Sequence, residues 1–252
     1  MTTTNPLFQP IGLPNLGNTC FMNSTLQALL VVREFGSGSA LEPFLNQYRA
    51  GQAAPAVARN MVATANAQFR NFQQHDSHEW MHALFDVVGD DKLTMFKGAF
   101  HVRVAFPCGH QNEHAEIFTS LSIPLAPSIS QGISKLLESS SVYSTCDTCG
   151  KQQPAVKHMT IQTFPRYLIV HWKRFQSSGR KIGTRVPPHL DGYELVSCVN
   201  HRGSHYGGHY TACTKYHAAC YMCNDASVFK IEVGHMVKAG EAAYLLVYRM
   251  KG

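Results

Sequence analysis

The chain has 252 residues, of which 44% are hydrophobic and 15% are charged, a composition typical of a globular protein with a substantial core rather than of a disordered segment. The formal net charge is +6, but Lys and Arg are scattered singly or in short pairs, which argues against nucleic-acid binding. No apolar run reaches the length of about 18 residues that a membrane span needs, and the first ten residues lack the pattern of a secretory leader, so we expect a cytoplasmic or nuclear protein that does not associate with a membrane.

Three helices are expected in the first hundred residues. The segment CFMNSTLQALLVVRE begins at Cys20, carries apolar residues at helical spacing and ends at the GSGS loop of residues 36–39. A second helix is expected in the Ala-rich stretch 53–67. The third follows Asp76-Ser-His-Glu79, a capping pattern, after which Trp80 and Leu84 mark one apolar face.

From residue 99 the pattern changes to that of strands. HVRVAF (101–106) alternates, IFTSLSIPLAP (117–127) follows, and a helix is expected in ISKLLES (133–139) before the turn-rich STCDTCGKQQP (144–154). Further strands are expected at 166–175, 193–200, 209–216 and 244–250. Helices followed by a mixed segment and then a sheet indicate the α+β class.

Cys20 lies where a glycine-containing turn meets the start of the first helix. A helix N-terminus and a nearby imidazole lower the pKa of a thiol and make it nucleophilic. The turn Gly17-Asn18-Thr19 offers backbone N–H groups to an oxyanion, and Asn15 offers a side-chain amide. Taken alone, however, a cysteine at a helix start is more often a packed core thiol.

A histidine with a suitable setting stands far downstream. His209 follows the pair Gly207-Gly208 at the start of a predicted strand, and glycines allow another backbone to approach closely. Asn224 and Asp225 come shortly afterwards and offer groups that could orient an imidazole. Cys, then His, then Asn or Asp is the chain order of papain-like proteases.

Several longer motifs carry a family resemblance. GLPNLGNTCFMNSTLQ resembles the cysteine box of the ubiquitin-specific protease family of deubiquitinases, and VNHRGSHYGGHYTACTK resembles its histidine box. HDSHEW is similar to the family's QDAHEF segment, HWKRF to its LKRF strand and AYLLVYR to its closing strand. The matches follow the family order from about residue 11 to 249, so a single catalytic domain is expected over residues 1–252.

The resemblance implies a papain-like α+β fold with thumb, palm and short zinc-ribbon-like fingers. The helical thumb would cover about residues 11–98, the fingers about 99–165 and the palm about 166–252. Within it, Cys20 would be the nucleophile, His209 the general base and Asn15 the oxyanion-hole residue. The third catalytic member falls on Asn224, and in some members the following acid, here Asp225, shares or takes that role.

The resemblance also implies a substrate channel. Asp76 and Glu79 match acidic residues that face the Arg-rich tail of ubiquitin, while the capping pattern gives them a structural role that can coexist with this one. Gly207, Gly208 and Tyr210 would wall a channel that admits only a Gly-Gly end. Ubiquitin, ubiquitinated proteins or a ubiquitin-like modifier are therefore the expected partners of a monomeric enzyme.

The sequence is compatible both with a bound zinc ion and with a metal-free site. Eight cysteines without a secretory leader favour reduced thiols, and Cys146-x-x-Cys149 is half of a zinc knuckle. The family often supplies Cys-x-x-Cys-Gly-His upstream, but here Ala105 replaces the first cysteine before Cys108-Gly109-His110. The expected zinc ligands are Cys108, His110, Cys146 and Cys149, with His114 as a weaker fourth choice and a decayed, metal-free site as the alternative. Four other cysteines are expected to be core thiols: Cys198, Cys213, Cys220 and Cys223.

The expected activity is thiol-dependent hydrolysis of the bond after the C-terminal glycine of ubiquitin. Three alternatives stay open. The first is a processing protease of the same fold, excised from a longer and possibly viral polyprotein, that cleaves after Gly-Gly-like tails. The second is a non-catalytic ubiquitin-binding module, and the third is a zinc-stabilised interaction scaffold.

Overall fold

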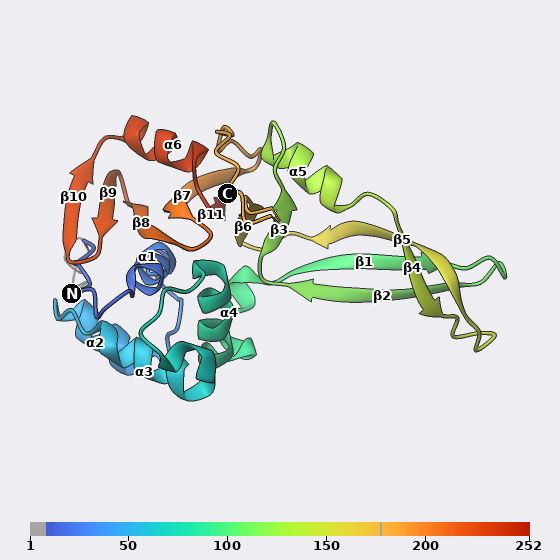
Figure 1. Ribbon diagram of the computed structural model, residues 1–252, viewed down its shortest axis with the longest axis horizontal. Helices are drawn as coiled ribbons and strands as arrows, with labels where there is room; N and C mark the ends of the chain where they lie inside the picture. Colours follow the sequence, from blue (N-terminus) through green and yellow to red (C-terminus); the bar gives the residue numbers. More distant parts are fainter. Residues whose placement is uncertain (1–8, 177) are drawn as a thin grey trace.

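The computed structural model describes residues 9–176 and 178–252, so the first eight residues, where no secretory leader is expected, lie outside the described part. Its helical half contains α1 (Cys20–Leu29), α2 (Glu42–Arg49), α3 (Pro55–Ala65) and α4 (Ser77–Val88), with short 3-10 turns at Ala67–Arg70, Asp90–Lys92 and Thr94–Phe96. These helices gather beside one face of a long sheet (Figure 1). No helix in the described ranges has the length and apolar character needed to cross a bilayer.

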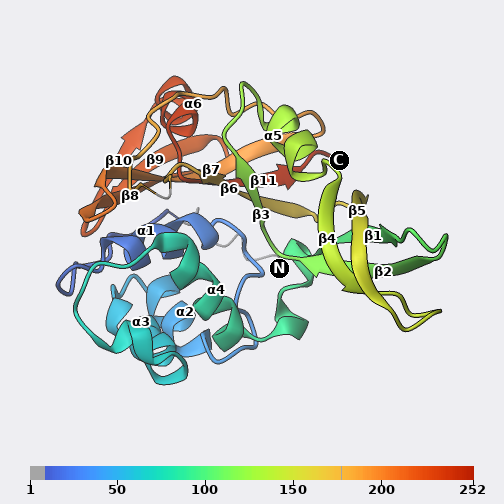
Figure 2. The same ribbon diagram turned by 45° about the vertical axis from the view of Figure 1, so that its right-hand side comes forward.

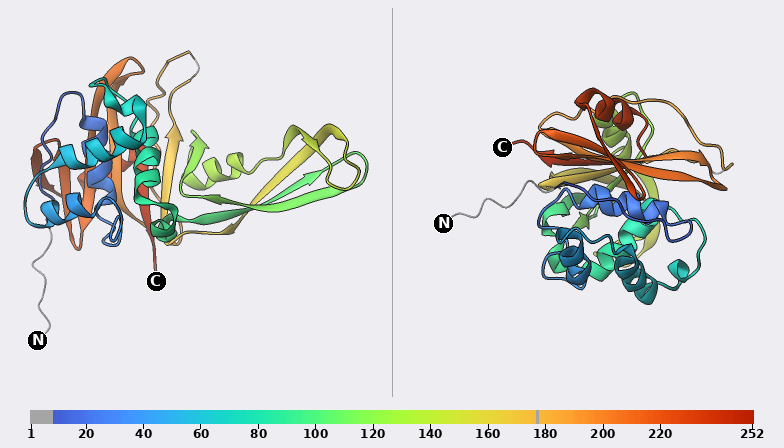
Figure 3. Two further views of the ribbon diagram at one scale, coloured as in Figure 1. Left: turned by 90° about the horizontal axis from the view of Figure 1, so that it is seen from below. Right: turned by 90° about the vertical axis from the view of Figure 1, so that its left-hand side faces the viewer.

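The long sheet has seven strands in the order β10-β9-β8-β7-β11-β6-β3. Their bounds are β3 (Leu121–Pro124), β6 (Tyr167–Lys173), β7 (Tyr193–Ser204), β8 (Gly207–Tyr216), β9 (Ala219–Asn224), β10 (Ser227–Ile231) and β11 (Leu245–Met250). All neighbours are antiparallel except β3 and β6, which are parallel. Helices α5 (Ile129–Leu136) and α6 (Val233–Glu241) cover the face opposite to α1 (Figure 2 and Figure 3, right).

A second sheet projects away from this body (Figure 3, left). It has the order β2-β1-β5-β4 and consists of β1 (Gly98–Ala105), β2 (Gln111–Phe118), β4 (Ser140–Thr145) and β5 (Gln152–Thr163), all antiparallel. Residues 121–136 fall in the range expected for the fingers, yet β3 and α5 belong to the seven-stranded body. The reason is that β3 pairs with β6 and closes that edge of the larger sheet.

The seven-stranded sheet separates two hydrophobic clusters. Ile169 packs into the cluster on the helical side, whereas Leu168, Val170 and Trp172 pack into the cluster under α5 and α6. Side chains of a strand alternate between the two faces of its sheet, so a strand covered on both sides reads as a continuous apolar run. This explains the sequence YLIVHW and confirms the buried strand expected there.

Helix α1 lies wholly inside the protein, because all ten of its residues are buried. It sits between the seven-stranded sheet and α4 (Figure 2). Its first turn has no side-chain cap at Thr19. The backbone N–H groups of that turn therefore remain free to act on the neighbouring sulfur.

The expected helices at Cys20, in 53–67 and after Asp76 are confirmed, whereas α2 and α6 were not expected. Helix α2 buries only three of its eight residues, and α6 contains two glycines, so neither carries a strong helical pattern. Helix α5 begins at Ile129, four residues before the predicted ISKLLES segment, because Ser128 caps it.

Candidate active site

Cys20 is the first residue of α1 and only 3% of it is exposed. Burial raises the pKa of its thiol above the usual 9.0, and the charge of Asp225 adds to this effect. Hydrogen bonds from the backbone N–H groups of Tyr210, Phe21 and Cys20 itself lower the pKa of the thiol in part. The net direction is upward, so the effect of burial on the pKa of the thiol outweighs these hydrogen bonds.

His209 and Asn224 meet on the adjacent strands β8 and β9. The Nε2 atom of His209 lies 2.6 Å from Oδ1 of Asn224. This bond fixes the ring and leaves Nδ1 for a second partner. Tyr210, the residue after His209, contacts the Cys20 sulfur through its backbone, so the strand that carries His209 passes directly beside the thiol. Within the described residues, the hydrogen-bond partners of this sulfur are backbone groups and not the His209 ring.

Asp225 faces away from the histidine and toward the cysteine loop. Its Oδ2 accepts a hydrogen bond from Nδ2 of Asn15 at 3.0 Å, and its Oδ1 accepts one from Nδ2 of Asn23 at 2.8 Å. Its backbone is in the left-handed region, with φ of 49°, and its carbonyl accepts the N–H of Leu13 at 2.8 Å. The two predicted alternatives for the third catalytic member thus have different partners.

Asn15 is held from both ends of its amide. Its Oδ1 accepts the backbone N–H groups of Gly17 and Thr19, each at 3.0 Å, while one N–H of its Nδ2 is used by Asp225. The turn between them needs two left-handed residues, Gly17 with φ of 92° and Asn18 with φ of 57°. The amide is therefore preorganised, and its second N–H remains to donate to a ligand.

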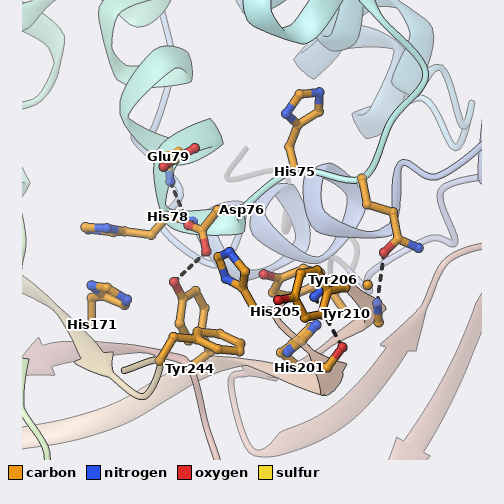
Figure 4. A pocket seen from close by; sticks show the side chains of 15 residues that line it. His75, Asp76, His78, Glu79, His171, His201, His205, Tyr206, Tyr210 and Tyr244 are labelled. Atoms are coloured by element: carbon orange, nitrogen blue, oxygen red, sulfur yellow. Dashed lines mark hydrogen bonds between the residues drawn. The ribbon is translucent and has the colours of Figure 1, made fainter. Parts of the chain in front are cut away.

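A cavity of about 460 Å³ opens between the N-terminus of α4 and the strands β7 and β8 (Figure 4). All five predicted substrate-binding residues line it, namely Asp76, Glu79, Gly207, Gly208 and Tyr210. Figure 4 shows Asp76 and Glu79 on the α4 side and His201, Tyr210 and Tyr244 on the strand side.

A glycine is required at position 208 in the wall of this cavity. A Cβ atom there would lie 2.2 Å from both the carbonyl oxygen of Arg202 and Nε2 of His201. Its N–H donates to Oε1 of Gln74 at 2.8 Å, a bond that joins the segment before α4 to β8. A residue with a side chain at this position could not keep the backbones of β7 and β8 this close.

Asp76 performs the capping role expected of it. Its Oδ1 accepts the backbone N–H groups of His78 and Glu79 at 2.8 and 3.0 Å, and its Oδ2 accepts the hydroxyl of Tyr244 at 2.5 Å. Glu79 stays exposed at the cavity, where burial of part of the side chain, followed by the charge of Asp76, raises the pKa of its carboxyl.

The predicted zinc ligands come together at the far end of the four-stranded sheet. The ligand atoms of Cys108, His110, Cys146 and Cys149 all lie within 4.8 Å of one another. The Sγ–Sγ distances from Cys108 are 3.8 Å to Cys146 and 3.7 Å to Cys149, and Nδ1 of His110 lies 3.5 and 3.6 Å from the sulfurs of Cys108 and Cys146.

These separations fit a single tetrahedral ion. Zinc bonds of about 2.3 Å to sulfur and about 2.0 Å to nitrogen place two sulfurs about 3.8 Å apart and a sulfur and a nitrogen about 3.5 Å apart. Hydrogen bonds, first from the backbone of His110 and then from neighbouring side chains, lower the pKa of Cys108 to about 6. His114, the weaker choice, instead contacts Glu116 at 3.0 Å. Cys198, Cys213, Cys220 and Cys223 are buried, as expected of core thiols.

Two residues of the site were not predicted from the sequence. Asn23 holds Asp225, and Gln74 holds Gly208. Asn23 carried a usable signal, since a polar residue on the buried face of an apolar helix needs a partner. Gln74 carried none, because its partner lies 134 positions away in the chain.

Comparison with known proteins identifies relatives along nearly the whole chain. The family model described as "Ubiquitin carboxyl-terminal hydrolase" matches residues 11–248. Ubiquitin carboxyl-terminal hydrolase 23 of Arabidopsis thaliana is 25% identical over 302 residues, and Ubiquitin carboxyl-terminal hydrolase Usp2 of Drosophila melanogaster is 26% identical over 324. Each alignment covers 94% of this chain but only 35% and 34% of the relative, so the chain spans about a third of their length.

A solved structure has the same fold. It is described as the SAGA DUB module with Ubp8, Sgf11, Sus1 and Sgf73 bound to monoubiquitin, and the matched chain is 19% identical with a TM-score of 0.75. The match covers 99% of this chain and 73% of that one. The papain-like α+β arrangement expected from the resemblance is thereby confirmed.

Proposed function

Since the chain belongs to the ubiquitin carboxyl-terminal hydrolase family, we propose that it is a cysteine deubiquitinase that hydrolyses the isopeptide or peptide bond after the C-terminal glycine of ubiquitin. The observation that carries the proposal is the meeting of three elements. Cys20 at the uncapped start of α1 touches the backbone beside His209, His209 is bonded to Asn224, and a glycine-walled cavity lies along the same strand.

In the proposed reaction the thiol of Cys20 gives its proton to His209, and the sulfur attacks the carbonyl carbon of the terminal glycine of ubiquitin. Asn224 keeps the imidazole oriented through its 2.6 Å bond. The tetrahedral oxyanion is stabilised by the free N–H of Asn15 and by the backbone N–H of Cys20.

Collapse of this intermediate breaks the carbon–nitrogen bond and forms a thioester, while the imidazolium protonates the leaving amine. Water then attacks the thioester as His209 removes its proton. The products are free ubiquitin with a C-terminal carboxylate and the regenerated thiol. Because burial raises the pKa of the Cys20 thiol in the free protein, we assign formation of the thiolate–imidazolium pair to the substrate-bound state.

The cavity suits an extended and basic tail. Glu79 offers an exposed carboxylate for an arginine of the tail, whereas both oxygens of Asp76 already serve the helix cap and Tyr244. Gly207 and Gly208 line the cavity without side chains of their own, so an extended tail can pass close to their backbone.

We further propose that Cys108, His110, Cys146 and Cys149 hold a structural Zn²⁺ ion. Three thiolates and one imidazole at tetrahedral separations are typical ligands for this metal. The ion would stabilise the two hairpin turns at the end of the four-stranded sheet and takes no part in the proposed chemistry.

The eight unpaired cysteines also support a location in the reducing cytoplasm or nucleus, which fractionation of cells would test.

The activity is tested with ubiquitin that carries an electrophilic C-terminus. We expect a covalent adduct on Cys20, detected by mass spectrometry, and none with Cys20→Ala. A folded protein that binds ubiquitin without forming the adduct would instead be a non-catalytic ubiquitin-binding module. Faster reaction with a ubiquitin-like reporter, or cleavage of a polyprotein junction ending in Gly-Gly, would identify a different substrate for the same site.

A further inference from the structure

Helix α4 carries a second group of possible metal ligands beside the substrate cavity. Its sequence His78-Glu79-Trp80-Met81-His82 places two histidines four positions apart, on one face of the helix. The same spacing on a helix is used for zinc binding by metalloproteases. In this protein it lies one residue beyond the helix cap.

Three donor atoms converge at this place. The Nε2 atoms of His78 and His82 are 3.1 Å apart, and the hydroxyl oxygen of Ser120 lies 3.1 Å from the first and 3.3 Å from the second. Two ligands bonded to one tetrahedral ion at about 2.0 Å are separated by about 3.3 Å. The triangle therefore already has the size that one small cation requires.

The ring of His78 is held in place by a neighbouring imidazole. His171 stacks on His78 with ring centroids 4.1 Å apart and fixes its plane, as seen in Figure 4.

The charge around the His82 ring is favourable to a cation. His82 is exposed and lines a surface hollow together with Asp86 and Asp90. His78 lines the substrate cavity, as does its chain neighbour Glu79. The hollow therefore gives a cation access to His82.

We propose that His78, His82 and Ser120 bind a divalent transition-metal ion of the Zn²⁺ class, at a site separate from the cysteine cluster. Two imidazoles are good ligands for this class, the hydroxyl is a weaker third, and water completes the coordination. Building on the proposed function, the bound ion opposes substrate binding, because His78 lines the same cavity and a positive charge on it disfavours the basic tail.

The number of ions bound tests the site without any need for catalysis. Zn²⁺ is titrated into the intact protein in competition with a chromogenic chelator, for the wild type, His82→Ala and the control His114→Ala. His82 and His114 are both exposed histidines, so neither change should affect folding. We expect His82→Ala to bind about one equivalent less than the other two proteins, and Ser120→Ala to bind that equivalent more weakly. Equal numbers for the wild type and His82→Ala would overturn the site.

The effect on substrate is measured separately with a ubiquitin C-terminal fluorogenic reporter. Zn²⁺ should raise KM in the wild type and not in His82→Ala. Because both proteins retain Cys20, comparing them accounts for any inhibition by Zn²⁺ at the catalytic thiol. An extra equivalent of Zn²⁺ with an unchanged KM would retain the metal site and overturn its effect on the tail. A protein inactive toward every reporter would refute the proposed function while the metal count still stands.

Discussion

Replacement of Asp225 by alanine should slow catalysis although this residue does not contact His209. Its carboxylate accepts hydrogen bonds from Asn15 and Asn23 at 3.0 and 2.8 Å, and a bond to a charged group contributes about 1.5 to 3 kcal/mol. Without it the Asn15 amide is no longer fixed as an oxyanion donor. Loss of one such donor lowers kcat by about 100- to 1000-fold, and we expect a loss of that order with little change in KM.

The same substitution should make the thiol more reactive. The negative charge of Asp225 raises the pKa of Cys20, so its removal lowers that pKa and increases the thiolate fraction at any given pH. The rate of alkylation by iodoacetamide should therefore rise at pH 8, and its pH profile should move to lower pH, while turnover of a ubiquitin reporter falls.

A double substitution tests the assignment. If Asp225 acts through Asn15, then Asn15→Ala combined with Asp225→Ala should be no slower than the slower single variant. Losses that multiply would refute the reasoning and indicate an independent role of Asp225. Thermal melting of each variant, with Asn23→Ala as the matched control for the second hydrogen bond, separates this effect from unfolding.

Three further changes address the rest of the site. Asn224→Ala removes the 2.6 Å bond that orients His209 and should lower kcat/KM by about 100-fold or more in a reporter assay, with Asn224→Asp restoring part of it. Gly208→Ala places a methyl group 2.2 Å from Nε2 of His201, and overpacking of this kind costs about 1 to 3 kcal/mol, so the melting temperature should fall. Cys149→Ser removes one of four metal ligands and should lower both the zinc content by elemental analysis and the melting temperature.

Each of these has a clear contrary result. Full activity of Asn224→Ala would show that the His209 ring needs no such partner. A Gly208→Ala protein of unchanged melting temperature would mean that β7 and β8 can move apart at this position without loss of stability. Equal melting temperatures of the wild type and Cys149→Ser, with and without a chelator, would favour the decayed, metal-free site.

Much of the site was predictable because its parts are short and local. The turn before Cys20, the glycines before His209 and the cap at Asp76 each occupy a few consecutive residues, and their chemistry follows from residue type. The four-ligand cluster was also foreseen, since His110 stands where a turn brings it beside the cysteines.

Contacts between distant segments were not predictable. The distinction between Asn224 and Asp225 depends on a backbone φ of 49° and on amides some 200 positions earlier in the chain. Helix α2 and strand β10 were missed because their helical or alternating patterns are weak, and they form only against neighbours supplied by the fold.

The burial of α1 has a consequence for the synthesis of the protein. This helix leaves the ribosome before the strands that cover it, and Asp225, which holds Asn15, comes 210 positions after that asparagine. At a translation rate of about 5 to 20 residues per second, the helix waits about 10 to 40 s for them. During this time α1 can pack against α4 but not against the sheet, so an apolar helix with a cysteine at its start stays uncovered on one side.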